Sequence, residues 1–168
     1  METMKILVTG GSAFIGSTIS DSLSTKYKVI SPTSQQLNLL NASDVKDYLN
    51  KNSFDIVIHS ANHLVHPLLK ESKEPSIQLV NNLKMFFNIA INKNLFGKMI
   101  YFGSGAEFGR ENWKSKMKES YFGNHYPTDQ YGLSKYFMNI HTRLSKNIYN
   151  LRLFGMYGTK DDWRFRFI

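Results

Sequence analysis

Two side chains suited to proton transfer, Tyr131 and Lys135, lie four residues apart in the stretch YGLSKYFMNIHTRLSK. If this stretch is a helix, residues four apart share one face, so the lysine ammonium would lie beside the phenol. An ammonium favours the phenolate and thereby lowers the tyrosine pKa. Lowering that pKa from about 10 to about 7 requires about 4 kcal/mol of differential stabilisation. The pair indicates acid/base chemistry, although the same spacing also arises by chance on a solvated helix face.

A glycine-rich turn near the N-terminus, TGGSAFIGST, has the composition of a phosphate-binding loop. From Gly11 it lies one residue away from the triphosphate loop G-x-x-x-x-G-K-[ST], with Ser17 in place of the lysine that reaches the outer phosphates. From Gly10 it reads G-x-x-A-x-x-G, with Gly10, Ala13 and Gly16 at the spacing of a dinucleotide-binding turn. The turn alone leaves both interpretations open.

Short apolar runs alternate with longer helical patterns along the chain. Five runs are expected to form strands: Lys5–Gly10, Tyr27–Ser31, Phe54–Ala61, Lys98–Ser104 and Ile148–Phe154. Helices are expected from Phe14 to Thr25, from Ser43, from Pro75 to about Asn94, and from about Tyr131 to Lys146. This alternation predicts an α/β fold of the Rossmann type, a doubly wound parallel sheet with helices on both faces.

The place of the glycine turn in this order decides between the two phosphate loops. The turn joins the first expected strand to the first helix, which is the context that a dinucleotide-binding turn requires. Glycines there permit close approach of the backbone to a pyrophosphate, and the helix N-terminus supplies unpaired N–H groups. Because the lysine is also absent, the sequence predicts a dinucleotide rather than a nucleoside triphosphate.

Six motifs, in order, resemble the extended short-chain dehydrogenase/reductase family, in particular its nucleotide-sugar epimerases, dehydratases and reductases. They are TGGSAFIG, DIVIHSAN, NNLKMFFN, GSGAEFG, YGLSK and LRLFGMYG, and together they extend over nearly all 168 residues. Two positions depart from the family pattern: Ala13 replaces the middle glycine of the turn, and Gly155 stands where asparagine is usual. The resemblance implies an NAD(P)-dependent enzyme that acts on a nucleotide sugar in polysaccharide or deoxysugar biosynthesis.

The resemblance also implies roles for individual residues. Tyr131 would be the acid/base that moves a proton to or from a sugar oxygen, with Lys135 assisting it and Ser104 hydrogen-bonding the same oxygen. The implied catalytic set is therefore Ser104, Tyr131 and Lys135. The implied cofactor-binding residues, with the 38–39 pair on the adenine side, are Gly10, Ala13, Phe14, Ile15, Gly16, Asn38, Leu39, Ser60, Ala61, Asn62, Asn82, Tyr131 and Lys135.

The residues that follow Ser104 reduce the number of reactions that the resemblance allows. The family's 4,6-dehydratases carry an Asp-Glu pair there, whereas this chain has Gly105 and Ala106, and neither can transfer a proton. Glu107 comes one position late and is expected on the other face of an extended segment. Lys160 stands where GDP-fucose synthases of the family carry a histidine, so double epimerisation by that route is not expected; a solvent-exposed loop lysine is an equal interpretation. Keto-reduction and epimerisation both stay open.

The sequence is compatible with NADP and with NAD. A site for NAD usually carries an acid near the end of the second strand, and the stretch VISPTS there has none. Its hydroxyl groups, with Lys26 and Lys28 nearby, would suit a 2′-phosphate. The balance favours NADP.

Residues 1–168 are expected to form one dinucleotide-binding domain. Chains of the family continue into a smaller C-terminal substrate region, which here is absent or only begun at about 155–168. An alternative is therefore a non-catalytic dinucleotide-binding module, whether a truncated remnant or a sensor. The resemblance further allows a homodimer through a four-helix bundle formed by the helices at 75–94 and 131–146.

Composition and motifs argue against a nucleic-acid-binding, membrane or metal-binding protein. The formal charge is +8, but the basic residues are scattered apart from RENWKSKMK, and without a recognised motif no nucleic-acid partner is expected. No apolar run reaches the ~20 residues that span a bilayer, so no membrane partner is expected. With no signal-peptide layout and no cysteine, a cytoplasmic protein is the simplest interpretation. His59, His63 and His66 lack partners at ligand spacing, so no metal site is expected.

Overall fold

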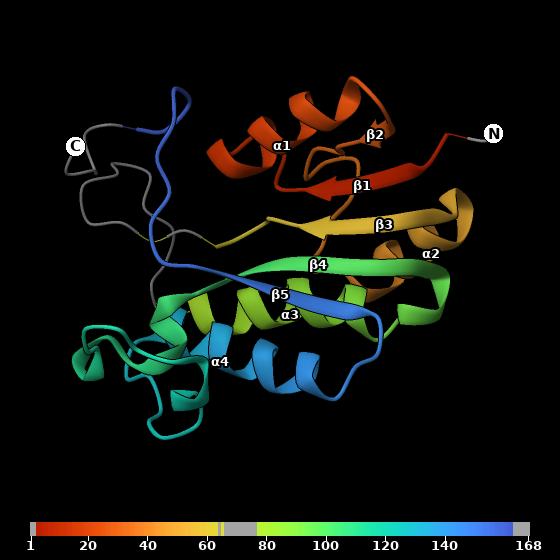
Figure 1. Cartoon of the computed structure of the whole chain (residues 1–168). Coiled ribbons are helices and arrows are strands. Elements are labelled where there is room, and N and C mark those ends of the chain that lie inside the picture. Colours follow the sequence, from red (N-terminus) through yellow and green to blue (C-terminus); the bar gives the residue numbers. More distant parts are fainter. Residues whose placement is uncertain (1–2, 64, 66–76, 163–168) are drawn as a thin grey trace.

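The computed structural model describes residues 3–63, 65 and 77–162, and its centre is a parallel sheet (Figure 1). The strand order is β2-β1-β3-β4-β5. The strands are β1 (Lys5–Thr9), β2 (Lys28–Ile30), β3 (Phe54–His59), β4 (Phe96–Ser104) and β5 (Ile148–Leu153). The predicted α/β fold is confirmed, and each strand lies within two residues of its predicted bounds.

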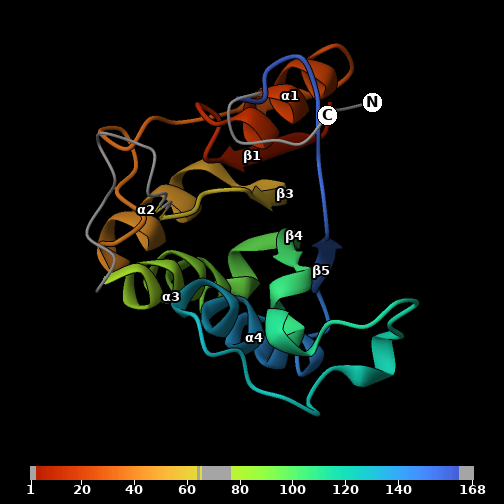
Figure 2. The same cartoon turned by 90° about the vertical axis from the view of Figure 1, so that its left-hand side faces the viewer.

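In the described residues, four α-helices cover the two faces of the sheet unequally. They are α1 (Phe14–Ser24), α2 (Ala42–Asn52), α3 (Gln78–Ala90) and α4 (Gln130–Arg143). Helix α1 lies on one face, whereas α2, α3 and α4 lie on the other (Figure 2). Pro75, the predicted start of the third helix, lies outside the described residues.

Successive residues of a strand point to opposite faces, so each face has its own apolar layer. The larger layer packs the sheet against α2, α3 and α4, and its fully buried side chains include Leu7, Val57, Phe86, Met99 and Tyr101. The smaller layer lies under α1 and contains Ile6, Val8 and Ile58, with Ile19 and Leu23 packed on them. Strands that are apolar on both faces are typical of a covered parallel sheet.

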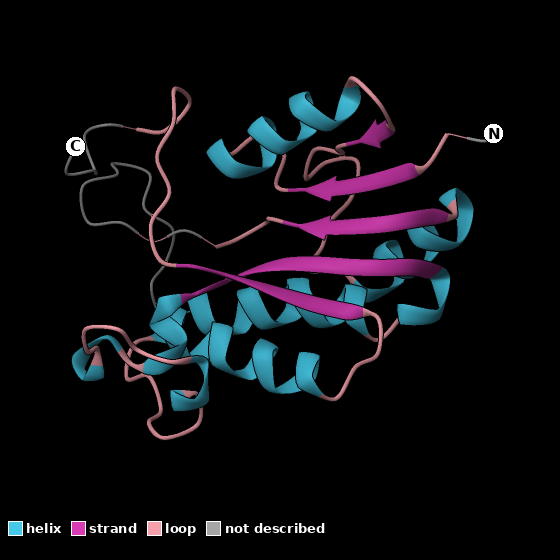
Figure 3. Cartoon of the chain, viewed as in Figure 1, coloured by secondary structure: helices cyan, strands magenta, loops and turns pink. Residues whose placement is uncertain are grey.

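The strand order reverses between β1 and β3, because the chain leaves β1 for β2 and then returns on the other side of β1. In open α/β sheets, ligands bind at such a switch point, outside the carboxyl ends of the strands. Figure 3 shows β1, β3 and β4 pointing in one direction. Their carboxyl ends carry Thr9, His59 and Ser104, and Thr9 is in register with His59. The residues that follow these three strands therefore share one edge of the sheet.

The connection from β4 to α4, predicted as a long loop, contains three short 3-10 turns: Gly105–Phe108, Arg110–Asn112 and Glu119–Tyr121. The indole of Trp113 donates a hydrogen bond to the Gly105 carbonyl oxygen over 2.9 Å, which fastens the connection to the end of β4. The connection therefore begins at the carboxyl edge of the sheet, where β1 and β3 also end.

Candidate active site

The two outer positions of the glycine turn have no room for a side chain. Gly10 has a φ of +74°, and a Cβ added to it would lie 2.6 Å from the backbone nitrogen of Ala61. A Cβ on Gly16 would overlap the Gly10 carbonyl oxygen. The first position thus brings the turn against the segment after β3, and the second brings α1 against the turn.

The amino end of α1 has no side-chain cap. Its N-cap residue is Ala13, and no side chain accepts a hydrogen bond from the first turn. The first N–H groups of a helix have no partner within the helix, so those of Phe14, Ile15 and Gly16 face a ligand or solvent. Such a terminus, next to a glycine turn, suits a phosphate group.

The carboxyl ends of β1 and β3 are tied together by polar groups. The backbone nitrogen of Ser60 donates to the Thr9 carbonyl oxygen over 3.2 Å. The Thr9 hydroxyl lies 2.9 Å from Nδ1 of His59. Burial, together with the charge of Lys135, lowers the pKa of His59 to about 3. His59 is therefore neutral at ordinary pH, and its contact with Thr9 joins the two strands.

Two side-chain amides beside this edge are incompletely satisfied. Oδ1 of Asn82, on α3, accepts a hydrogen bond from the backbone nitrogen of His63 over 2.7 Å. Nδ2 of Asn82 and Oδ1 of Asn62 are buried and have no partner among the described residues. Buried polar atoms are nearly always hydrogen-bonded, so these two indicate a polar ligand. Ser60 and Ala61, the other predicted cofactor residues here, precede Asn62 directly.

Ser104 and Tyr131 are brought together from two elements. Ser104 ends β4 and its Oγ accepts a hydrogen bond from the Ala106 backbone nitrogen over 3.2 Å. Tyr131 lies in the first turn of α4. Burial raises the pKa of Tyr131, while a side-chain hydrogen bond with Ser104 works in the opposite direction. The two hydroxyl groups are therefore placed to act on one ligand oxygen.

Lys135 lies beneath this pair and is 5% exposed. Its Nζ donates to the Phe102 carbonyl oxygen over 2.9 Å and lies 5.7 Å from the centroid of the Tyr131 ring. Burial lowers the pKa of Lys135 to about 8, and Glu107 opposes this. The predicted catalytic residues are thus close together, in a site that favours a protonated phenol when no ligand is bound.

The polar face of α4 is the buried one. Its buried residues are Gly132, Ser134, Lys135, Tyr136, Met138, Asn139 and Thr142. Apolar side chains lie on the opposite side of the helix, where Phe137, Ile140 and Leu144 are 37–81% exposed. The interpretation that Lys135 lies on a solvated face is wrong. Two polar side chains of the buried face find acceptors there, because Lys135 donates to the Phe102 carbonyl oxygen and Asn139 to the Glu107 carboxylate.

Glu107 corrects a second expectation. The residues after Ser104 form a 3-10 turn rather than an extended segment, and the Glu107 side chain is fully buried. Its Oε1 accepts a hydrogen bond from the Ser104 backbone nitrogen over 3.0 Å, as half of a capping box. The spelling S-G-A-E is the sequence signature of that box and would have revealed the turn.

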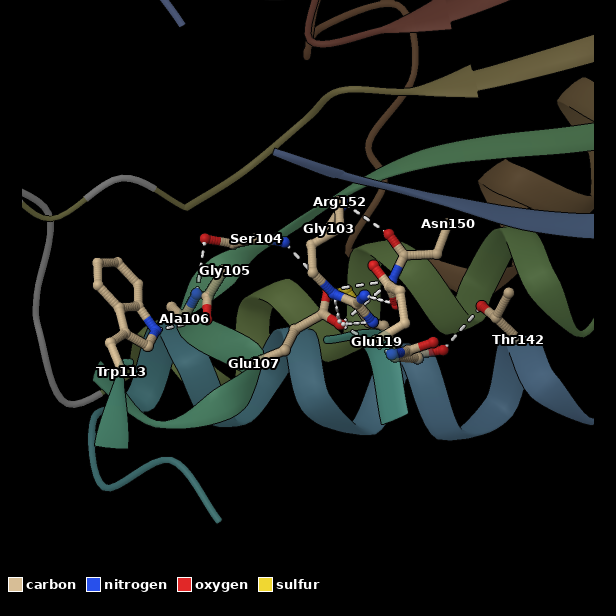
Figure 4. A network of polar contacts seen from close by, with 12 residues as sticks. Gly103, Ser104, Gly105, Ala106, Glu107, Trp113, Glu119, Thr142, Asn150 and Arg152 are labelled. Atoms are coloured by element: carbon tan, nitrogen blue, oxygen red, sulfur yellow. Dashed lines mark hydrogen bonds and ion pairs between the residues drawn. The ribbon is translucent and has the colours of Figure 1, made fainter. Parts of the chain in front are cut away.

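The Glu107 carboxylate is the centre of a polar network that joins three elements (Figure 4). It accepts hydrogen bonds from Asn139 of α4 over 2.8 Å, and from Asn150 and Arg152 of β5 over 3.1 Å each. Arg152 also pairs with Glu119 at the surface. Burial raises the pKa of Glu107 and outweighs Arg152, which lowers it. The network fixes the end of β4, and with it Ser104, against α4.

Other predicted positions lie apart from this cluster. Asn38 accepts a hydrogen bond from Leu40 in its own turn, and the Leu39 carbonyl oxygen accepts one from Asn88 of α3. Their adenine-side role stays a prediction. Lys160 forms an ion pair with Asp21 of α1.

The two lysines offered in support of NADP are not beside the predicted hydroxyl groups. Lys28 is in register with Lys5, at the amino end of β2. Lys26 precedes that strand. The hydroxyl groups of Ser31 and Thr33 follow the opposite, carboxyl end of β2, so the lysines do not support a 2′-phosphate site there.

Within residues 3–63, 65 and 77–162, no three side chains among His, Cys, Asp and Glu are grouped to hold a metal ion. His66 lies outside these residues. No helix in the described part of the chain has the length and apolar character to cross a membrane.

Comparison with known protein families gives one match over most of the chain. The sequence profile of the NAD dependent epimerase/dehydratase family matches residues 6–166. Among curated relatives, the GDP-L-colitose synthase of Yersinia pseudotuberculosis is 30% identical over 64% of this chain and 36% of its own length. The GDP-L-fucose synthase of Azorhizobium caulinodans is 30% identical over 52% of this chain and 28% of its own.

Solved structures share the fold at low identity. A GDP-D-glycero-L-gluco-heptose synthase from Campylobacter jejuni, determined with NADPH, has a TM-score of 0.82 and 24% identity, over 98% of this chain and 52% of that one. A GDP-mannoheptose C4 reductase from the same organism, with NADP bound, has a TM-score of 0.83 and 23% identity, over 96% of this chain and 55% of that one. This chain thus spans about half the length of these structures.

Proposed function

Because this chain belongs to the NAD dependent epimerase/dehydratase family, we propose that it is the cofactor-binding part of a nucleotide-sugar keto-reductase or epimerase. The main support for the proposal is that Ser104, Tyr131 and Lys135 lie close together at the carboxyl edge of the sheet. Relatives named as enzymes of GDP-linked sugars support a nucleotide sugar as substrate. They also favour an enzyme over a non-catalytic module.

In the proposed reaction, Tyr131 exchanges a proton with the sugar oxygen that Ser104 holds by a hydrogen bond. Burial raises the pKa of Tyr131, so the phenol is protonated at neutral pH in the free protein. A protonated phenol is the form that gives a proton to an oxygen on which negative charge develops. The site is therefore ready for carbonyl reduction, whereas removal of a hydroxyl proton first requires the phenolate.

The described residues fit a nicotinamide dinucleotide, which would supply the hydride for the carbonyl carbon. Gly10 and Gly16 allow the turn to pack closely against Ala61 and α1, and the uncapped start of α1 offers N–H donors to a pyrophosphate. The unpartnered amide atoms of Asn62 and Asn82 offer further hydrogen bonds. We infer NADP rather than NAD, because hydroxyl groups at Ser31 and beyond replace the acid that an NAD site carries.

A titration of the 168-residue chain with NADPH and with NADH, followed by nicotinamide fluorescence, tests the cofactor site. We expect tighter binding of NADPH. Gly10→Ala should abolish binding, since its methyl group would meet Ala61 and its φ of +74° strains any side chain. Gly123→Ala is the matched control, because Gly123 also has a positive φ, +97°, but has open space around it. Unchanged affinity in Gly10→Ala would contradict the site.

We also propose that two chains associate through α3 and α4. An apolar groove between these helices is lined by Leu83, Phe87, Phe137, Ile140, His141 and Leu144. Exposed apolar surface of this kind marks association sites, and two helices from each chain would form a four-helix bundle. Sedimentation equilibrium should give a dimer that Ile140→Glu converts to monomer and that Ser22→Glu, exposed on α1 at the other face of the sheet, leaves intact. A monomeric unaltered chain would refute it.

A further inference from the structure

Arg110 was singled out in the sequence only as part of a basic stretch, but the fold places it at the Tyr131 ring. Gly109, with a φ of +72°, turns the chain between two 3-10 turns just after the end of β4. A Cβ on Gly109 would lie 2.9 Å from Nδ2 of Asn112, so a side chain there would be both strained and crowded. This turn directs Arg110 back toward the amino end of α4.

An aspartate holds Arg110 in this position. Arg110 forms an ion pair with Oδ2 of Asp129 over 2.8 Å. The other carboxylate oxygen, Oδ1, accepts a hydrogen bond from the Gly132 backbone nitrogen over 2.8 Å and so caps α4. One carboxylate thus joins Arg110 to the helical turn that carries Tyr131. Arg110 and Asp129 are each partly exposed, with 48% and 37% of their side chains accessible.

Two cations lie at the same phenol ring. The guanidinium carbon of Arg110 is 5.6 Å from the centroid of the Tyr131 ring, and Nζ of Lys135 is 5.7 Å from it. Both distances are within the range of a cation–π interaction. We propose that Arg110 is a positioning residue for Tyr131: it supplies a second cation at the ring, and Asp129 holds that cation in place. This inference rests on the proposed catalytic role of Tyr131.

The charged and titratable groups around Tyr131 come from four segments. Burial raises the tyrosine pKa; Ser104 at the end of β4 and Arg110 lower it; Glu107 of the first 3-10 turn and Asp129 raise it. Lys135 faces the ring from within α4. Arg110 and Asp129 therefore act on the phenol with opposite sign.

A tyrosine titration of the 168-residue chain measures this role without cofactor or substrate. With ¹³C-labelled tyrosine, NMR follows the Tyr131 resonance, which is identified by its loss in Tyr131→Phe, and circular dichroism checks the fold at each pH. Removing the cation in Arg110→Met should raise the titration midpoint by about half a pH unit, since a half-exposed pair is screened. Arg110→Lys should restore most of the shift. Asp129→Asn keeps the capping oxygen but removes both a nearby negative charge and the group that holds Arg110, so its midpoint should lie below that of Arg110→Met.

A midpoint that is unchanged in Arg110→Met, or that Arg110→Lys leaves as far shifted as Arg110→Met, would overturn the proposal. The pH profile of carbonyl reduction provides the second measurement. Reduction needs the protonated phenol, so activity falls as pH rises through the Tyr131 pKa. In Arg110→Met this fall should move to higher pH, with the KM for NADPH unchanged. Because the NMR titration needs no turnover, it stands even if the proposed function fails.

Discussion

Glu107→Ala should lower the free energy of unfolding by about 3–5 kcal/mol, the cost of removing one partner of a buried ion pair. The substitution leaves Arg152, whose side chain is 8% accessible, without its buried carboxylate. It also deprives Asn139 and Asn150 of an acceptor and removes half of the capping box at Ser104. Urea unfolding followed by circular dichroism measures the change.

The control for this substitution is Glu119→Ala. Glu119 contacts the same Arg152, but its side chain is 76% accessible. An exposed pair contributes only about 0–1 kcal/mol, so Glu119→Ala should be nearly neutral. The double variant Glu107→Met, Arg152→Met should recover part of the stability lost in Glu107→Ala, because no buried charge is then left alone. Equal losses in Glu107→Ala and Glu119→Ala would contradict the buried network.

Tyr131→Phe should reduce turnover by about 10²–10⁴-fold, the usual contribution of a positioned acid or base. Phenylalanine keeps the ring beside Arg110 and Lys135 but has no proton to give. The dissociation constant for NADPH should therefore change by no more than about twofold, since cofactor contacts are retained. The assay follows NADPH oxidation with a nucleotide-linked 4-keto sugar, and a fluorescence titration gives the affinity.

Tyr149→Phe is the matched control, because Tyr149 lies 46% exposed on β5 and should tolerate loss of its hydroxyl. Turnover in Tyr131→Phe within tenfold of the unaltered chain would remove Tyr131 from the reaction. A chain that binds NADPH yet reduces none of the keto sugars offered to it would favour the non-catalytic module instead. These outcomes separate catalysis from cofactor binding.

The strands and the order of elements were predictable because apolar periodicity depends on local sequence. The apolar run Lys5–Gly10 is typical of a buried strand, and the glycine-rich turn follows it directly. The four-residue spacing of Tyr131 and Lys135 likewise fixes their shared helix face before any tertiary contact is known. That Ser104 joins them followed from the resemblance, which related the end of one strand to a helix many residues later.

The inward face of α4 and the role of Arg110 were not predictable in the same way. Burial of Lys135 depends on the Phe102 carbonyl oxygen, and the direction of Arg110 depends on the positive φ of Gly109. Both are consequences of long-range packing. The position of Glu107 was predictable from local sequence, because the pattern S-x-x-E indicates a capped turn.

The order of the sheet also bears on how concentrated solutions of this chain will behave. In the described residues β5 pairs only with β4, so its other side presents unpaired backbone N–H and C=O groups. Tyr149 and Leu151 on that strand are 46% and 49% exposed. An apolar strand with a free backbone edge is a template onto which a strand of another molecule can add. We expect light scattering to grow with concentration as strands add edge to edge. Leu151→Lys should suppress this growth.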